Sequence, residues 1–310
     1  MGSVEQGISI IQANGIGSLA AETLTHTHRY SVRGNTSKGL FLEGVGETLI
    51  FLSYERFCGP FTVNLPNDAA GLMADIQPGE VIIGTDSCAL AIDSLQLRIA
   101  TSGIHPWIPA PYIEKVTNKV IANNTTRLAQ WAGDNIPTNS LLSITAALLT
   151  GNVNTEMSNK LMRYLKDLES AIRSKDQDNF LLSASLLVGL GNGLTPSGDD
   201  LLTGINLAVN RYSRLFPRLS FYLPWMRELE QVIRTKTTMI SSALFQAAFQ
   251  GFADERLIDA FDEMMSDDMH LDRVIGPLSA WGASSGFDSL AGILLILSVI
   301  NSESNIADLQ

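Results

Sequence analysis

The hydrophobic pattern changes near residue 110, and this change limits the folds open to the chain. Before it, short apolar runs lie between Gly and Pro residues, as in "GPFTVNLP" (59–66) and "PGEVIIG" (78–84). After it, apolar residues recur every three or four positions, as in "KLMRYLKDLESAI" (160–172). The first pattern is typical of short strands and the second of helices. The sequence therefore predicts an α+β protein.

Two domains are the first expectation for 310 residues. We predict a strand-rich domain, a small antiparallel sheet or barrel, over residues 1–112, and a mainly helical domain over 113–310. The stretch "HPWIPAPYI" contains three prolines near the boundary and looks like a linker. The first helices should end at Gly133 and Gly151, with Thr138 as a possible cap. The predicted helices cover residues 114–133, 138–151, 154–175, 178–188, 196–212, 225–250, 255–265, 270–281 and 286–300.

Charge and composition exclude several classes of partner. The formal net charge is −11, which argues against nucleic acid or an anionic membrane as a partner. The longest apolar run, "LAGILLILSVI" (290–300), is too short to span a bilayer. Cys58 and Cys88 have no CxxC spacing, and the chain begins without a secretory pattern. We expect reduced thiols and a cytoplasmic location.

The stretch "GLGNGLTPSGDDLLTG" (189–204) combines glycines, a turn and adjacent aspartates. Its glycines allow positive φ and close approach of the backbone. Thr195 is a good N-cap, with Pro196 at the first helical position. Asp199 and Asp200 then fall in the first turn, where the helix dipole favours carboxylates.

A second stretch, "SGFDSLAG" (285–292), repeats part of the first. The two share the frame S-G-x-D-x-L-x-G at an offset of 88 residues. Gly282 is placed to end the preceding helix, and Ser284 or Ser285 to cap the next, with Asp288 in its first turn. The matching context indicates a duplicated helix-loop-helix unit or two like-built half-sites.

Two helix starts with free N–H groups can form a small polar site for phosphate or carboxylate. Asp199, Asp200 and Asp288 would repel a bare anion, so they fit better with a cation such as Mg²⁺, or with an amide or amine donor. Hydroxyls of "TTMISSALFQAAFQG" (237–251) could line the same site. Every element also fits a purely structural reading, as caps, dipole partners and helix-packing glycines such as Gly204 and Gly292.

These arguments give one set of candidate residues. The ligand-binding candidates are Gly191, Asn192, Gly193, Thr195, Ser197, Gly198, Asp199, Asp200, Thr238, Ser241, Ser284, Ser285, Gly286 and Asp288. The metal hypothesis concerns Asp199, Asp200 and Asp288, with Mg²⁺ as the only cofactor considered. A catalytic residue is not assigned, because no histidine or lysine base lies near Ser197 in sequence.

Other motifs are weaker. "GLGNGL" is followed by no Gly-Lys-Ser/Thr, so it is not a Walker loop, and its spacing differs from a dinucleotide fingerprint. His26 and His28 could bind a metal, but an exposed pair near a strand start explains them better.

The sequence resembles the AllH family at these same residues. "GLGNGLTPSGDDLLTG" is close to the family signature, and "TTMISSALFQAAFQG" and "GASSGFDSLAG" follow in the expected order. "GPFTVNLP" is similar to the strand-rich first half of the family. The resemblance covers most of the chain, from about residue 30 to residue 300.

This resemblance implies a subunit of oxamate carbamoyltransferase, an enzyme of anaerobic allantoin breakdown that acts with two further subunits. The implied reaction moves a carbamoyl group from oxalurate to phosphate and gives oxamate and carbamoyl phosphate. The resemblance assigns no catalytic residue, and it implies a site at the signature residues only. The alternatives left open are a non-catalytic scaffold subunit and a stand-alone Mg²⁺-dependent phosphate-handling enzyme.

Overall fold

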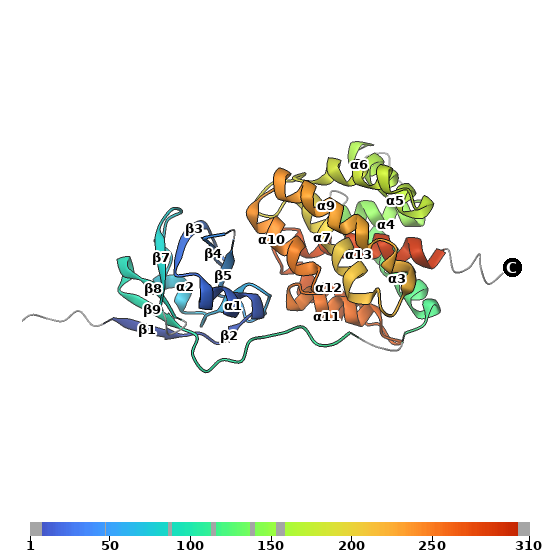
Figure 1. The fold of residues 1–310 in the computed structure, drawn as a ribbon. Coiled ribbons are helices and arrows are strands. Elements are labelled where there is room, and N and C mark those ends of the chain that lie inside the picture. Colours follow the sequence, from blue (N-terminus) through green and yellow to red (C-terminus); the bar gives the residue numbers. More distant parts are fainter. Residues whose placement is uncertain are drawn as a thin grey trace, which may run out of the picture. The chain divides into compact units, whose positions relative to one another are not determined.

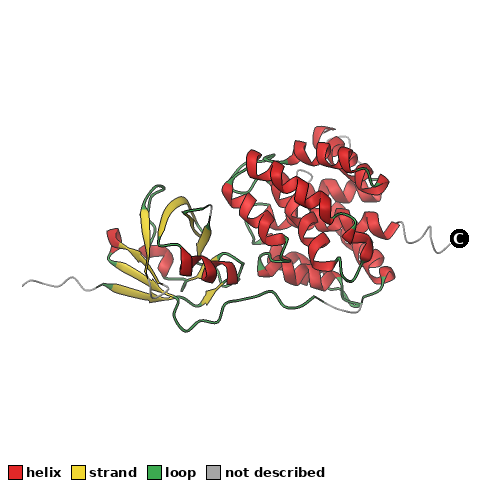
Figure 2. Ribbon diagram, viewed as in Figure 1, coloured by secondary structure: helices red, strands yellow, loops and turns green. Residues whose placement is uncertain are grey.

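The computed structural model describes residues 8–46, 48–85, 89–112, 116–136, 140–152 and 159–302. Cys88 and the possible cap Thr138 lie outside these ranges. The chain divides into two compact units, Met1–Pro109 and Ala110–Gln310. The first carries strands and the second is helical (Figures 1 and 2), which confirms the predicted α+β class.

The N-terminal unit is built on one nine-stranded sheet, in the order β1-β9-β8-β7-β3-β4-β5-β6-β2. It curls into a half-barrel around a core of Leu, Ile and Val side chains. The pairs β1–β9 and β5–β6 are parallel, so the predicted antiparallel sheet is in fact mixed. The strands are β1 Ser9–Gln12, β2 Gly15–Ile16, β3 Arg29–Thr36, β4 Gly39–Gly44, β5 Leu49–Ser53, β6 Thr62–Asn64, β7 Val81–Thr85, β8 Ala89–Ile92 and β9 Leu97–Ala100.

Helix α1 (Ser18–His26) interrupts the strands where only strands were expected. Its Ala20 and Leu24 are buried in the core of the sheet, which explains why so short a helix is stable. Two shorter helical segments, α2 (Ala69–Leu72) and η1 (Asp93–Leu95), join later strands.

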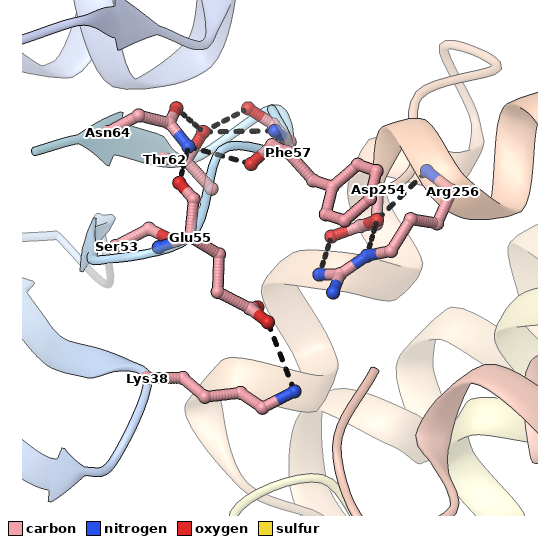
Figure 3. Close-up of polar contacts among 9 residues, drawn as sticks. Lys38, Ser53, Glu55, Phe57, Thr62, Asn64, Asp254 and Arg256 are labelled. Atoms are coloured by element: carbon pink, nitrogen blue, oxygen red, sulfur yellow. Dashed lines mark hydrogen bonds and ion pairs between the residues drawn. The ribbon is translucent and has the colours of Figure 1, made fainter. Parts of the chain in front are cut away.

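The buried Asn64 side chain holds the connection between the parallel strands β5 and β6 (Figure 3). Its Nδ2 donates to the carbonyls of Glu55 at 2.9 Å and Phe57 at 2.7 Å. Its Oδ1 accepts the Thr62 hydroxyl at 2.9 Å, and that hydroxyl also accepts the Gly59 N–H. Parallel strands are usually joined by a helix, whose backbone groups bond to each other. Here the connection is a loop, and the side chains of Asn64 and Thr62 bond to its backbone groups instead.

The helical unit is a bundle of helices that follow one another along the chain (Figure 1). Its helices are α3 Asn118–Asn135, α4 Leu141–Thr150, α5 Asn159–Ser174, α6 Gln177–Leu187, α7 Ser197–Tyr212, α8 Pro217–Ser220, α9 Leu223–Lys236, α10 Met239–Ala248, α11 Glu255–Met264, α12 Leu271–Ser279 and α13 Ser285–Ser302. Within the described part of the chain, no helix has the length and apolar character that a membrane span requires.

Several helix boundaries differ from prediction, and three of these differences have a clear local cause or position. The expected helix over 225–250 is two helices, because Thr237 takes an extended conformation and Thr238 caps α10. Helix α3 continues past Gly133 to Asn135. Helix α4 begins after Ser140, whose hydroxyl accepts the N–H of Ser143 at 3.1 Å.

Helices α7 and α13 cross through a pair of glycines. A Cβ on Gly204 would lie 2.0 Å from the carbonyl oxygen of Ser289, and a Cβ on Gly292 would lie 1.9 Å from that of Leu201. The four positions are equivalent in pairs, because Ser289 and Gly292 stand 88 residues after Leu201 and Gly204. The helices therefore cross on a local two-fold axis, at a distance that only glycine allows.

The same two-fold relation extends to the neighbouring helices. Helix α4 packs on α13, and α10 packs on α7. Both α4 and α10 begin with a hydroxyl N-cap and a Ser three residues later. Before them, α3 packs on α4 and α13, while α9 packs on α10 and α7. The helices α3–α7 and α9–α13 thus form two like-built repeats, with α8 between them.

A buried ion pair stabilises the second repeat (Figure 3). Asp254 caps α11 and binds the guanidinium of Arg256 through two contacts of 2.8 Å. The Arg256 side chain is only 3% exposed and lies over the ring of Trp281. Two-pronged contact and ring stacking together compensate for desolvation of the charge.

We predict that Gly204→Ala destabilises the helical unit by on the order of 3 kcal/mol or more, because backbone must move to admit the Cβ. Urea unfolding followed by circular dichroism measures this loss. Gly133→Ala is the matched control, since its Cβ would meet nothing within 4 Å in helix α3. The control should be neutral or more stable by up to about 1 kcal/mol. Equal stability of the two variants would contradict the close crossing.

Candidate functional site

The glycine loop between α6 and α7 folds back over the start of α7. Gly189, Gly191 and Gly193 have φ values of +74°, +123° and +104°, which confirms the predicted positive φ. A Cβ on Gly191 would lie 2.6 Å from the backbone nitrogen of Ser197. The N–H of Gly198 donates to the Leu190 carbonyl at 2.8 Å.

The prediction that Thr195 caps α7 is wrong. Pro196 itself takes the extended cap conformation, so the helix begins one residue later than expected, at Ser197. The N–H groups of Asp199 and Asp200 donate to the Pro196 carbonyl at 2.9 and 3.1 Å. The Thr195 hydroxyl is thereby free for another partner, and it lies 3.0 Å from the hydroxyl of Ser285. That contact joins the two loops predicted as half-sites.

The loop before α13 repeats these contacts with three fewer residues. Gly282 has φ +65°, and a Cβ there would lie 3.0 Å from the Ser285 hydroxyl. The N–H of Gly286 donates to the Trp281 carbonyl, as Gly198 does to Leu190. The N–H of Asp288 donates to the Ser284 carbonyl at 2.9 Å, and Asp288 lies in the first turn as predicted.

Asp199 has a structural role. Its Oδ1 accepts the Gly189 N–H at 2.8 Å, and its Oδ2 accepts the Thr237 hydroxyl. It ties the beginning of the glycine loop to the segment before α10. Burial raises the pKa of the Asp199 carboxyl, while the hydrogen bonds from Thr237 and Gly189 oppose that rise.

Asp200 and Asp288 are equivalent positions of the two repeats, and both are buried, at 5% and 1% exposure. Oδ1 of Asp288 accepts the N–H of Leu141, the first residue of α4, at 3.2 Å. Oδ2 of each carboxyl has no hydrogen-bond partner among the described residues. Burial raises the pKa of Asp200 well above its usual range, and the charge of Asp288 adds to this rise. Burial also raises the pKa of Asp288.

Hydroxyl groups reach these carboxyls across the two-fold axis. The Ser285 and Thr195 hydroxyls lower the pKa of Asp200 by hydrogen bonding. The Ser197 and Ser284 hydroxyls do the same for Asp288. The carboxyl of Asp200 in α7 is thus near Ser285, the first residue of α13, and the carboxyl of Asp288 in α13 is near Ser197, the first residue of α7. All four hydroxyl residues are half-buried.

The structure brings most of the candidate residues into one cluster. Thr238 joins it by donating to the Leu194 carbonyl at 2.7 Å, and Ser241 lies against Asp199. Asn192 and Gly193 lie on the exposed part of the loop. His26 and His28 are exposed in the other unit, next to the start of β3.

The carboxyls do not converge as metal ligands. In residues 8–302, leaving aside the undescribed stretches, no group of three or more His, Cys, Asp or Glu side chains could hold a metal ion. The donors beside Asp200 and Asp288 are hydroxyls and a backbone N–H, which carry no charge. The arrangement suits hydrogen-bonding groups better than a cation, and the Mg²⁺ hypothesis gains no support from it.

Two contacts were not identified from the sequence. Thr237 was expected only as one of several hydroxyls that could line the site, and its bond to Asp199 Oδ2 was not foreseen. The N–H of Leu141 comes from a helix 147 residues away from Asp288. The paired start patterns T-x-x-S at α10 and S-x-x-S at α4 could have indicated that both helices face like-built sites.

The fold and the cluster define an α+β protein whose helical unit joins two polar helix starts on a local two-fold axis. Residues 187–297 match the family model described as oxamate carbamoyltransferase subunit AllH. This segment includes both loops, α10 and the α7–α13 crossing, and it confirms the resemblance drawn from the signature residues. No solved structure matches the chain.

We predict that Asp200 makes the stability of the helical unit depend on pH. Its pKa is raised in the folded protein, so the unfolded chain, with a pKa of about 3.9, loses its proton at lower pH. The folded state therefore loses stability as pH rises above about 4, until the raised pKa is passed. Asp200→Asn cannot ionise and should escape this loss.

The measurement is the free energy of unfolding of Asp200→Asn minus that of the wild type, by urea titration between pH 4 and pH 8. The difference should grow with pH and then level off. Asp178→Asn, at an exposed position in the first turn of α6, is the control for replacing an aspartate near a helix start. A difference that stays flat with pH would show that Asp200 is ionised at little cost.

Proposed function

We propose that this chain is a subunit of an oxamate carbamoyltransferase-like enzyme that binds a small carboxylate, carbamoyl or phosphate ligand at the starts of α7 and α13. The observation that carries this proposal is the position of the AllH match, which coincides with the paired loops. The family supplies the reaction, carbamoyl transfer, and the paired loops supply a place for its ligand.

The chemistry of the cluster is suited to carbamoyl transfer. That reaction needs an electrophilic carbonyl polarised by hydrogen-bond donors and a nearby site for a carboxylate or phosphate. Half-buried hydroxyls at the starts of two long helices provide such donors. No covalent intermediate is required of this chain.

The partners in this proposal are the other carbamoyltransferase subunits, and the setting is cytoplasmic ureide breakdown. A family described as a subunit implies such partners. The negative net charge supports neither nucleic acid nor an anionic membrane as a partner. A non-catalytic scaffold subunit is the alternative that the structural ties of Asp199 favour, because part of the signature then serves loop geometry.

We predict that Thr195→Val together with Ser285→Ala lowers phosphate-dependent cleavage of oxalurate by at least about tenfold, when the chain is assayed with its partner subunits. The two hydroxyls lie 3.0 Å apart, where the loops meet, and each good hydrogen bond contributes about 1 kcal/mol. The assay follows carbamoyl phosphate formation.

Thr235→Val is the matched control, because the exposed Thr235 hydroxyl bonds only to the backbone of its own helix α9. It should keep full activity. A double variant that folds and keeps full activity would favour the scaffold alternative. Activity of the chain alone that depends on added Mg²⁺ would favour a stand-alone phosphate-handling enzyme.

A further inference from the structure

The buried carboxyls of Asp200 and Asp288 lower the stability of the folded protein unless hydrogen-bond donors or acceptors meet their oxygens. Each is less than one-tenth exposed, and each has a buried oxygen without a partner in the described part of the chain. An unsatisfied buried polar atom costs about 1–3 kcal/mol, so its retention in both repeats needs a reason. A ligand that supplies hydrogen bonds to both oxygens is such a reason.

The positions of the two carboxyls restrict what this ligand can be. They come from equivalent positions of two repeats that cross at Gly204 and Gly292. The groups placed against them are hydroxyls and the N–H of Leu141, without a cation to offset further negative charge. A bare phosphate or carboxylate would meet repulsion there.

We propose that Asp200 and Asp288 bind the carboxamide end of the ligand, with Asp288 accepting an N–H of its NH₂ group and the O–H of protonated Asp200 donating to its carbonyl oxygen. This inference rests on the proposed function and assigns two residues that set its ligand preference. A planar carboxamide presents one acceptor and two N–H donors side by side. A carboxylate beside a carboxylic acid is the complementary arrangement.

The two residues take different roles because their surroundings differ. Asp288 accepts a backbone N–H through Oδ1, a bond that favours the ionised form and leaves Oδ2 as an acceptor. Asp200 has no backbone donor of this kind among the described contacts, and burial with the nearby charge of Asp288 raises its pKa further. The donor role in this recognition is therefore assigned to Asp200 and the acceptor role to Asp288.

The experiment compares oxamate with pyruvate as probes, by isothermal titration calorimetry on the full-length protein at pH 7. Pyruvate has the charge and nearly the shape of oxamate, but a methyl group replaces NH₂. The wild type should bind oxamate at least about tenfold more tightly than pyruvate. In Asp288→Asn, Oδ1 stays with the Leu141 N–H, so Nδ2 replaces the acceptor. Oxamate affinity should then fall at least about tenfold, while pyruvate affinity changes little.

Asp200→Asn gives the opposite expectation, because an amide N–H replaces the carboxylic O–H as donor. Its oxamate affinity should fall less than about threefold. Asp178→Asn, exposed on α6, is the control for both variants. Thermal unfolding checks that each variant folds. If Asp288→Asn does not fold, the wild-type preference and the Asp200→Asn result still decide.

Three results would overturn the inference: equal binding of oxamate and pyruvate by the wild type, a larger loss in Asp200→Asn than in Asp288→Asn, or no binding of either probe. Inorganic phosphate is the competing probe. If phosphate displaces oxamate, and Asp200→Asn and Asp288→Asn lose oxamate affinity equally, the inference is overturned in favour of an anion site. The oxalurate cleavage assay reports on the proposed function separately. Cleavage with no preference for oxamate refutes only the carboxamide assignment, and preference without cleavage refutes only the proposed function.

Discussion

The crossing of α7 and α13 is the constraint on which the helical unit depends. Two glycines allow the backbones to meet at a distance that a single Cβ would prevent. Close approach at this point brings the two helix starts near each other, because the glycines stand only seven residues after Ser197 and Ser285. The paired loops are thus a consequence of helix packing, and the hydroxyl contact between Thr195 and Ser285 follows from it.

The two repeats are alike in packing but differ in their loops. The loop before α7 is three residues longer and carries three glycines at positive φ, while the loop before α13 carries one at Gly282. Asp199 also has no acidic equivalent, since Phe287 stands at that position in the second repeat. Asp199 fixes the longer loop to the α10 start through Gly189 and Thr237. A pseudo-symmetric frame therefore supports an asymmetric surface, as a ligand with two different ends requires.

Much of this arrangement could be predicted from the sequence. Hydrophobic period and glycine position are local signals, so most helices of the helical unit, the positive φ of Gly191 and the first-turn aspartates were predicted correctly. The S-G-x-D-x-L-x-G frame also indicated two like-built units before the crossing was known. The glycines of this frame were more informative than its other residues, because a glycine that ends the frame allows another backbone to approach closely.

The remaining features depend on partners distant in sequence. The parallel pairing of β5 and β6 depends on Asn64 satisfying carbonyls of a loop, and a strand pattern carries no sign of that. The cap of α7 was predicted wrongly because Thr and Pro both suit a helix start, and only the contact with Ser285 decides between them. The N–H of Leu141 reaches Asp288 because α4 packs on α13.

The polarity of the site is set by desolvation more than by the number of acidic residues. Three aspartates near two helix starts would suggest a metal site if the carboxylates were solvated and ionised. Burial instead raises the pKa of all three, and the neighbouring donors are uncharged. A carboxyl that retains its proton gains a donor that an ionised carboxylate does not have. For that reason the same residues that repel an anion can recognise a neutral group, and burial is the property that makes the difference.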